Sequence, residues 1–265
     1  MAIYIGIFGA MIGSFLNVVA YRVPLKRSII SPPSACTECS MPIKRYDNIP
    51  VLSWVILHGR CRNCQTSISP RYPIVELTTG IVFAVVSLKF LHHSGSVVYL
   101  LIAFLYLAAM SIVLTLIDLE THTLPNALVL PGYLVGAIFL GAAGIATGDY
   151  GAMLRGAIGA AALWLLYFLM AIAYPDGMGF GDVKFAGVLG LFLGYLGWDS
   201  LITGGFAAFI FGGLFALSLV LLRKKDLKSG IPFGPWMVTG AWVGVFFGTS
   251  IVQSYLSIFS PSAGI

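Results

Sequence analysis

Long apolar runs alternate with short polar segments along most of the chain. Eight runs are long enough, or nearly so, to cross a bilayer, which takes about twenty apolar residues. They cover residues 2–21, 73–91, 97–117, 126–147, 152–174, 183–198, 203–222 and 235–258. The polar region 22–72 is the only one large enough to hold structure of its own. The pattern predicts an all-α polytopic membrane protein with about eight transmembrane helices and a loop domain between the first two.

The composition agrees with this interpretation. Of the 265 residues, 58% are hydrophobic and only 9% are charged, whereas a soluble domain carries about 25% charged residues. Glycine is abundant, with 31 residues, as expected where transmembrane helices pack closely. The net charge of +5 comes mostly from one loop beside a membrane segment, so we expect the lipid bilayer, and no nucleic acid, as a partner.

The positions of the basic residues predict which side of the membrane each loop faces. The first run has no basic residue before it and three soon after it, the reverse of a cleavable signal peptide, which indicates a retained helix with its N-terminus outside. The first, third, fifth and seventh loops then face the cytoplasm and hold most basic residues, as the positive-inside rule requires. These are Arg22, Lys26, Arg27, Lys44, Arg45, Arg60, Arg62 and Arg71 in the first loop, Lys184 beside the fifth, and Arg223, Lys224, Lys225 and Lys228 in the seventh. Only Lys89 and Arg155 fall outside.

All four cysteines lie in the 22–72 loop, as two Cys-x-x-Cys pairs. Cys36 and Cys39 are followed after 21 residues by Cys61 and Cys64, which is the spacing of a zinc site with four thiolate ligands. A loop of this size has too little apolar mass for a core of its own, so a metal that joins two turns would stabilise it. Because four thiolates leave no open coordination position, we expect a structural zinc ion.

Two disulfide bonds or a redox pair are the alternatives for these cysteines. Disulfide bonds are disfavoured because the charge distribution places the loop in the reducing cytosol. A redox motif normally uses a single Cys-x-x-Cys pair. His58 lies nearby, but a site with four cysteines has no need of it, and we interpret it as a loop residue.

Two aspartates border apolar runs, where a charge is costly. Asp118 follows one run and lies shortly before Leu124-Pro125, and Asp182 ends a Gly-x-Gly-Asp sequence beside another run. The predicted topology puts both at the cytoplasmic face. Acid proteases hold two carboxylates close enough to share one proton, so that one acts as a base towards water and the other as an acid. The positions therefore predict a catalytic aspartate pair.

Each aspartate also has a plainer interpretation. An aspartate at a helix end is often a cap, and one near a lysine is often an ion pair. Lys184, two residues beyond Asp182, would bias the ionisation of Asp182 or bind a substrate group. Glu120 and Asp176 lie on the same predicted face as the pair.

The order of these motifs resembles that of the bacterial prepilin peptidases, also called leader peptidase/N-methyltransferases, which are membrane aspartyl proteases of the Gly-x-Gly-Asp type. The resemblance runs through nearly the whole chain and includes Gly13-Ser14-Phe15-Leu16-Asn17, the paired cysteines, Arg71-Tyr72-Pro73 with Glu76, and Ile231-Pro232-Phe233-Gly234-Pro235. Ile117-Asp118 and Gly179-Phe180-Gly181-Asp182 resemble the two aspartate motifs. Asn126 departs from the family pattern, which often has Asp there.

The resemblance implies a bifunctional enzyme of the bacterial inner membrane. It would cleave the basic leader of type IV prepilins or type II secretion pseudopilins at the cytoplasmic face. It would then methylate the new N-terminus with S-adenosylmethionine. Asp118 and Asp182 carry over as the catalytic pair, and Cys36, Cys39, Cys61 and Cys64 as the zinc ligands. We expect three parts: the first helix (1–21), a zinc-binding domain (22–72) and a protease domain (73–265).

The methyl donor has no recognisable site in the sequence, because no glycine-rich dinucleotide-binding motif is present. Gly13, Asn17, Arg22 and Glu76 are candidates beside the zinc loop, with packing or helix capping as the alternative. Two other functions stay open at this point. One is an aspartyl protease without methylation, and the other is a transporter whose buried aspartates bind protons or cations.

Overall fold

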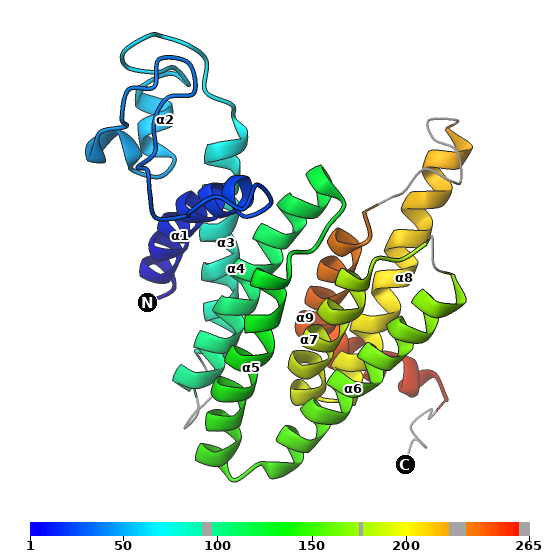
Figure 1. The fold of residues 1–265 in the computed structure, drawn as a ribbon. Helices are drawn as coiled ribbons and strands as arrows, with labels where there is room; N and C mark the ends of the chain where they lie inside the picture. The colour runs from blue at the N-terminus through cyan, green and yellow to red at the C-terminus, as the bar shows by residue number, and fades with distance from the viewer. Residues whose placement is uncertain (92–96, 175–176, 223–231, 260–265) are drawn as a thin grey trace. The chain divides into compact units, whose positions relative to one another are not determined.

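The computed structural model describes residues 1–91, 97–174, 177–222 and 232–259 (Figure 1). Within these ranges the regular structure is helical, with two isolated β-bridges and no strand, which confirms the predicted all-α class. The helices are α1 Ala2–Arg22, η1 Arg45–Asn48, α2 Leu52–Ile56, α3 Arg71–Phe90, α4 Val97–Thr121, α5 Asn126–Thr147, α6 Tyr150–Ala173, α7 Phe180–Leu196, α8 Trp198–Leu221 and α9 Gly234–Phe259.

The predicted spans coincide with the long helices. Seven described helices are long and apolar enough to cross a membrane, namely α1, α3, α4, α5, α6, α8 and α9. The predicted span 183–198 corresponds to α7, which has 17 residues. The main difference lies at the end of α4, which continues to Thr121 rather than stopping at residue 117. As a result Asp118 is part of a helix and not of a loop.

The helices form two compact units, residues 1–117 and 118–265. In the first unit, α1 and α3 pack as an antiparallel pair with small residues at the contact. A Cβ atom on Gly6 would lie 3.2 Å from the Gly80 carbonyl oxygen, and one on Gly13 would lie 2.8 Å from Cα of Glu76. Such close approach is typical of helix pairs in membranes, where packing replaces the hydrophobic driving force.

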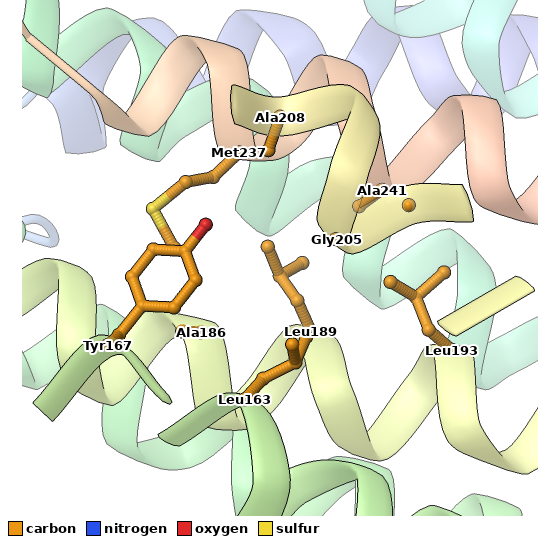
Figure 2. A pocket seen from close by; sticks show the side chains of 10 residues that line it. Leu163, Tyr167, Ala186, Leu189, Leu193, Gly205, Ala208, Met237 and Ala241 are labelled. Atoms are coloured by element: carbon orange, nitrogen blue, oxygen red, sulfur yellow. The ribbon is translucent and has the colours of Figure 1, made fainter. Parts of the chain in front are cut away.

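In the second unit, α7 is the central helix, and it packs against α5, α6, α8 and α9 (Figure 1). Its contact with α6 leaves no room for side chains, because a Cβ atom on Gly159 or Gly190 would run into the backbone of the other helix. The space between α6, α7, α8 and α9 is almost filled, and the cavity in Figure 2 measures only about 10 Å³. That is about the room of one water molecule. Tyr167 supplies the only hydroxyl group among the residues that line it.

The connections between helices are unequal in length. α5 and α6 are joined through Gly148 and Asp149, where Gly148 ends α5 in the left-handed conformation, and α7 and α8 are joined through Gly197 alone. The connections between α4 and α5 and between α6 and α7 are longer, and the one between α1 and α3 holds the cysteines. The long connections therefore alternate with short ones along the second unit.

Candidate active site and metal centre

Asp118 lies in the last turn of α4 with its side chain almost fully buried. Its Oδ2 atom accepts a hydrogen bond of 2.9 Å from the backbone N–H of Gly234, the first residue of α9. A carboxylate is stabilised at a helix N-terminus, where backbone N–H groups are unpaired. Asp118 is therefore held by the start of a helix 116 residues further along the chain.

Asp182 lies in the first turn of α7. Its Oδ2 atom accepts a hydrogen bond of 3.1 Å from the backbone N–H of Gly179, so this side chain caps its own helix. Gly181 packs closely against Leu124, because a Cβ atom there would lie 3.0 Å from Cβ of Leu124. The capping role expected as the plainer interpretation of Asp182 is thus present, and it uses one of the two carboxylate oxygens.

The two aspartates converge on Leu124. Leu124 contacts Gly181 beside Asp182, and its Cδ2 atom lies 3.4 Å from the Cβ position of Gly234, which holds Asp118. The two carboxyl groups lie within range of an unfavourable electrostatic interaction with each other. Among the described residues, neither Oδ1 atom makes a hydrogen bond. Each carboxylate is thus fixed through one oxygen and keeps the other for a proton or a water molecule.

Of the polar side chains Tyr167 and Lys184, the first approaches the aspartates and the second does not. The hydroxyl group of Tyr167, on α6, lies within electrostatic range of Asp182, and its ring packs against Phe233, the residue before Gly234. Lys184 points to α5 instead: its Nζ atom donates a hydrogen bond of 3.0 Å to Oδ1 of Asn126 and lies 5.2 Å from the ring centre of Phe180. Asp176 lies outside the described residues.

The four cysteines form one cluster in which the Sγ atoms all lie within 4.8 Å of one another. Tetrahedral coordination at a Zn–S distance of 2.3 Å separates sulfur atoms by about 3.8 Å, and Sγ of Cys36 lies 3.7 Å from Sγ of Cys64. The cluster could therefore hold a metal ion, and its donor set and spacing fit zinc. All four are free thiols, which argues against the disulfide alternative.

The two Cys-x-x-Cys pairs lie in equivalent turns, a repeat that was not recognised in the sequence. The N–H groups of Cys36 and Cys61 donate to the carbonyl oxygens five residues ahead, those of Met41 and Thr66. Ser40 and Gln65 both have positive φ, of 56° and 60°. An isolated β-bridge closes each turn, between Ala35 and Pro42 in the first and between Arg60 and Ser67 in the second. The signal missed in the sequence is that these residues recur at an interval of 25.

Backbone groups in these turns favour the thiolate form that binds metals. A backbone hydrogen bond at Met41 is the main cause that lowers the pKa of Cys39 to about 6. Backbone hydrogen bonds at Cys64 and Asn63 likewise lower the pKa of Cys61. The pKa of Cys64 is raised to about 12: a backbone hydrogen bond at Thr66 lowers it, but desolvation and the three other thiols outweigh that effect. A cation at the centre would remove this repulsion between neighbouring thiolates.

Outside the cluster, an ion pair joins the second cysteine turn to the short helix η1. The guanidinium group of Arg62 donates to both carboxylate oxygens of Asp47, at 2.6 Å in the shortest contact, and lies over the ring of Tyr46. The hydrogen bond from Arg62 lowers the pKa of Asp47, so the pair persists to more acidic pH than an isolated aspartate would. Arg62, which follows Cys61 in the sequence, therefore forms an ion pair with Asp47.

The candidates for the methyl-donor site all have structural partners. Gly13 is a helix contact, Asn17 donates to the carbonyl oxygens of Gly13 and Tyr72, and Arg22 donates to those of Ser28 and Pro32. Glu76 accepts from the N–H of Val51 at 2.6 Å. A cavity of about 260 Å³ lies beside α1, but its lining has no carboxylate for a sulfonium or an amino group. These contacts support the packing and capping interpretation of the four residues.

Sequence reasoning assigned no role to Gly234 or Tyr167, and it considered Glu76 only for the methyl-donor site. Gly234 holds Asp118, Tyr167 approaches Asp182, and Glu76 connects α3 to the metal-binding loop. Gly234 and Glu76 belong to motifs that could be noticed in the sequence, although only the fold shows what they contact. Tyr167 is one tyrosine within an apolar helix, and nothing in its surroundings would have singled it out.

Comparison with known proteins gives a consistent result. The model of the bacterial peptidase A24 N-terminal domain matches residues 7–90, and that of the type IV leader peptidase family matches residues 105–217. A prepilin leader peptidase/N-methyltransferase of Aeromonas salmonicida is 35% identical, over 95% of this chain and 92% of the relative. Proteins of the same name from Pectobacterium carotovorum and Pseudomonas aeruginosa are 33% and 30% identical, over 91% and 94% of this chain and 91% of each relative. No solved structure matches the chain significantly.

The fold and the site define a multi-pass membrane protein with a cluster of four cysteines that could hold a metal ion and a pair of helix-end aspartates. The matched segments cover most of the chain. The chain belongs to the type IV leader peptidase family. This membership favours the peptidase over the transporter interpretation.

Proposed function

We propose that this chain cleaves the basic leader of type IV prepilins or type II secretion pseudopilins and then methylates the new N-terminus with S-adenosylmethionine. Protease and N-methyltransferase activities are those of the relatives, which are named for both. We assign the cleavage to Asp118 and Asp182. The observation that carries this assignment is the convergence of two carboxyl groups, each fixed through Oδ2 and free at Oδ1.

The chemistry follows from the repulsion between the two carboxylates. Two carboxyl groups at short range do not both ionise, because their negative charges repel each other. The pair therefore retains one proton. The ionised carboxylate takes a proton from a water molecule as that water attacks the scissile carbonyl carbon. The protonated one gives its proton to the carbonyl oxygen, and the leaving amine is protonated as the C–N bond breaks. The N–H groups of Gly179 and Gly234 keep both side chains oriented during these steps.

Cleavage of a model prepilin tests this assignment. We expect Asp118→Asn and Asp182→Asn each to reduce cleavage by about 100- to 10,000-fold, because an amide cannot exchange a proton with water or the carbonyl group. Asp149→Asn is the matched control, since Asp149 caps α6 by accepting from Ala152 and asparagine caps equally well. Methylation of a substrate that is already cut should continue in both catalytic variants. Cleavage at the wild-type rate in either variant would refute the two-aspartate mechanism.

We further propose that Cys36, Cys39, Cys61 and Cys64 bind one structural zinc ion. The support is a set of four sulfur atoms that all lie within 4.8 Å of one another, with no fifth ligand group in the cluster. Bound zinc would neutralise the thiolates and tie the two turns together. The three-part division expected from the sequence is proposed with it, and residues 22–72 are then the zinc-binding domain.

Metal analysis tests the zinc proposal. We expect one zinc ion per purified chain, and a loss of most of it in Cys61→Ser, because three thiolates hold the ion less tightly than four. His58→Ala should retain the full zinc content, since His58 is not part of the cluster. Iron or no metal in the wild-type protein would contradict the proposal.

We propose that the protein lies in the bacterial inner membrane, with its active site at the cytoplasmic face and its N-terminus outside. The distribution of basic residues supports this orientation, although Arg223, Lys224, Lys225 and Lys228 lie outside the described residues. The acidic side chains Asp118, Glu120 and Asp182 would then lie on the side from which a basic leader arrives.

A further inference from the structure

The short helix α2 in the metal-binding loop exposes an apolar face. Leu52, Val55 and Ile56 are 51%, 56% and 60% exposed, and Ile49 just before them is 48% exposed. The opposite face is used within the loop: Ser53 is buried, and the indole N–H of Trp54 donates to the carbonyl oxygen of Ile68. Three large aliphatic side chains on one face of a five-residue helix need an apolar surrounding.

A hydrogen bond fixes the depth of this helix relative to the membrane. The N–H of Val51, directly before α2, donates to Oε2 of Glu76 at 2.6 Å. Glu76 is buried in α3, five residues after its start and thus roughly 7.5 Å along its axis. The 20 residues of α3 extend about 30 Å, which is the thickness of the hydrocarbon core. With α3 spanning the core, Glu76 lies within its outer quarter, so the beginning of α2 lies no farther out than the interface and not out in the water.

The backbone at this connection is held in an unfavourable conformation. Val51 has φ of 61°, which is rare for a β-branched residue and persists only where surrounding contacts enforce it. The bond to Glu76 is such a contact. The hydrogen bond that ties the start of α2 to α3 is thus a specific feature of the fold.

The charge around α2 matches an anionic surface. Residues 22–72 carry eight basic side chains and, as acidic ones, only Glu38 and Asp47. Asp47 is moreover paired with Arg62. Basic residues beside a membrane helix are attracted to anionic lipid headgroups, and an apolar face flanked by basic residues is typical of helices that lie in the interface.

We propose that α2 is an interfacial anchor, with Leu52, Val55 and Ile56 inserted at the boundary between headgroups and acyl chains of an anionic bilayer. The anchor holds the metal-binding loop flat against the membrane at the ends of α1 and α3. This anchor goes beyond the proposed catalysis, because it requires neither the protease nor the methyltransferase activity. A prepilin is the alternative occupant of the same face, and the experiment separates the two.

Photo-crosslinking of the full chain in lipid nanodiscs tests the anchor. A photo-activatable amino acid is introduced at position 56 or, as the matched control, at position 41. Met41 is similarly exposed, at 52%, but lies in a cysteine turn. With labelled phosphatidylglycerol in the nanodisc, we expect at least fivefold more lipid adduct at position 56 than at 41. Equal labelling at both positions, or no lipid adduct at 56, would overturn the proposal.

Two further arms complete the experiment. Adding a prepilin should leave the lipid adduct at position 56 in place; an adduct with the prepilin alone would make this face a protein-binding surface and overturn the proposal. Ile56→Glu should reduce the lipid adduct formed from position 52 at least fivefold and leave the metal content unchanged, whereas Met41→Glu should leave both unchanged. An unchanged adduct in Ile56→Glu would also count against the anchor.

Discussion

At the scale of single residues, the candidate site depends on how each carboxylate is held. Asp118 and Asp182 each give one oxygen to a backbone N–H at the start of a helix, α9 and α7 respectively. A helix start favours the ionised form of a carboxylate, whereas the neighbouring carboxylate favours the protonated form. In the proposed mechanism, this opposition would keep one transferable proton in the pair.

Gly234 is the residue where this arrangement is most easily disturbed. A Cβ atom there would lie 2.8 Å from Oδ2 and 3.2 Å from Cγ of Asp118. We expect Gly234→Ala to displace the Asp118 carboxyl group and to lower the cleavage rate by about 100-fold, since small misplacements of catalytic groups cost this much. Cleavage of a model prepilin, with equal amounts of inserted protein, is the measurement.

Gly213→Ala is the control for that variant, because a Cβ atom on Gly213, in α8, would meet nothing within 4 Å. It should cleave at the wild-type rate. Equal rates in both variants would show that the Asp118 carboxyl group does not depend on the space beside Gly234.

At this scale the sequence predicted the residue types but not their partners. Asp118, Asp182 and the cysteines could be chosen because a charge beside an apolar run and paired Cys-x-x-Cys turns are unusual. Asp118 and Gly234 are 116 residues apart in the sequence, and their contact arises from tertiary packing. No local sequence pattern therefore predicts it.

At the scale of elements, glycine decides which helices come closest. On α6 and α7, Gly159 and Gly190 face each other with backbone against backbone, and Gly194 meets the carbonyl group of Arg155. Hydropathy predicted both helices, because each is an apolar run. It did not predict that α7 would be central, since its glycines were read as part of a general enrichment and not as one packing surface.

Gly159→Ala tests this packing surface. The added methyl group would collide with the carbonyl group of Gly190, and overpacking of this kind costs about 1–3 kcal/mol. That exceeds the gain of about 0.5–1 kcal/mol expected from alanine in a helix. We expect a lower thermal unfolding temperature in detergent.

The control is Gly205→Ala, in α8, whose Cβ atom would lie 3.5 Å from Leu163, an ordinary contact distance. Its unfolding temperature should stay the same or rise slightly. A decrease as large as that of Gly159→Ala would mean that any methyl group added in these helices destabilises them.

In the two cysteine turns, too, the sequence predicted the chemistry but not the arrangement of the elements. The four cysteines were sufficient to predict a metal site, because the ligands and their spacing are the chemistry itself. The repeated turn was overlooked since its other positions share conformation rather than residue type. Ser40 and Gln65 have the same positive φ, yet neither is the glycine that usually marks such a position.

At the scale of the whole molecule, the predicted orientation is the property that most needs a direct test. We expect alkaline phosphatase fused after Gly148 to be active, because the connection between α5 and α6 should face the outside. The same enzyme fused after Thr123, between α4 and α5, should be inactive. Phosphatase activity in cells, corrected for the amount of each fusion protein, is the measurement, and the reverse pattern would invert the orientation.

The unequal connections have a practical consequence for inhibition. The links through Gly148, Asp149 and Gly197 are very short, whereas the cysteines lie in a long connection and Asp118 and Asp182 lie in helix ends that border longer ones. In the proposed orientation, an antibody or a large inhibitor supplied from outside the cell would find few residues to bind. A compound directed at this enzyme would therefore have to cross the membrane, or enter from within it, to reach the aspartates or the cysteines.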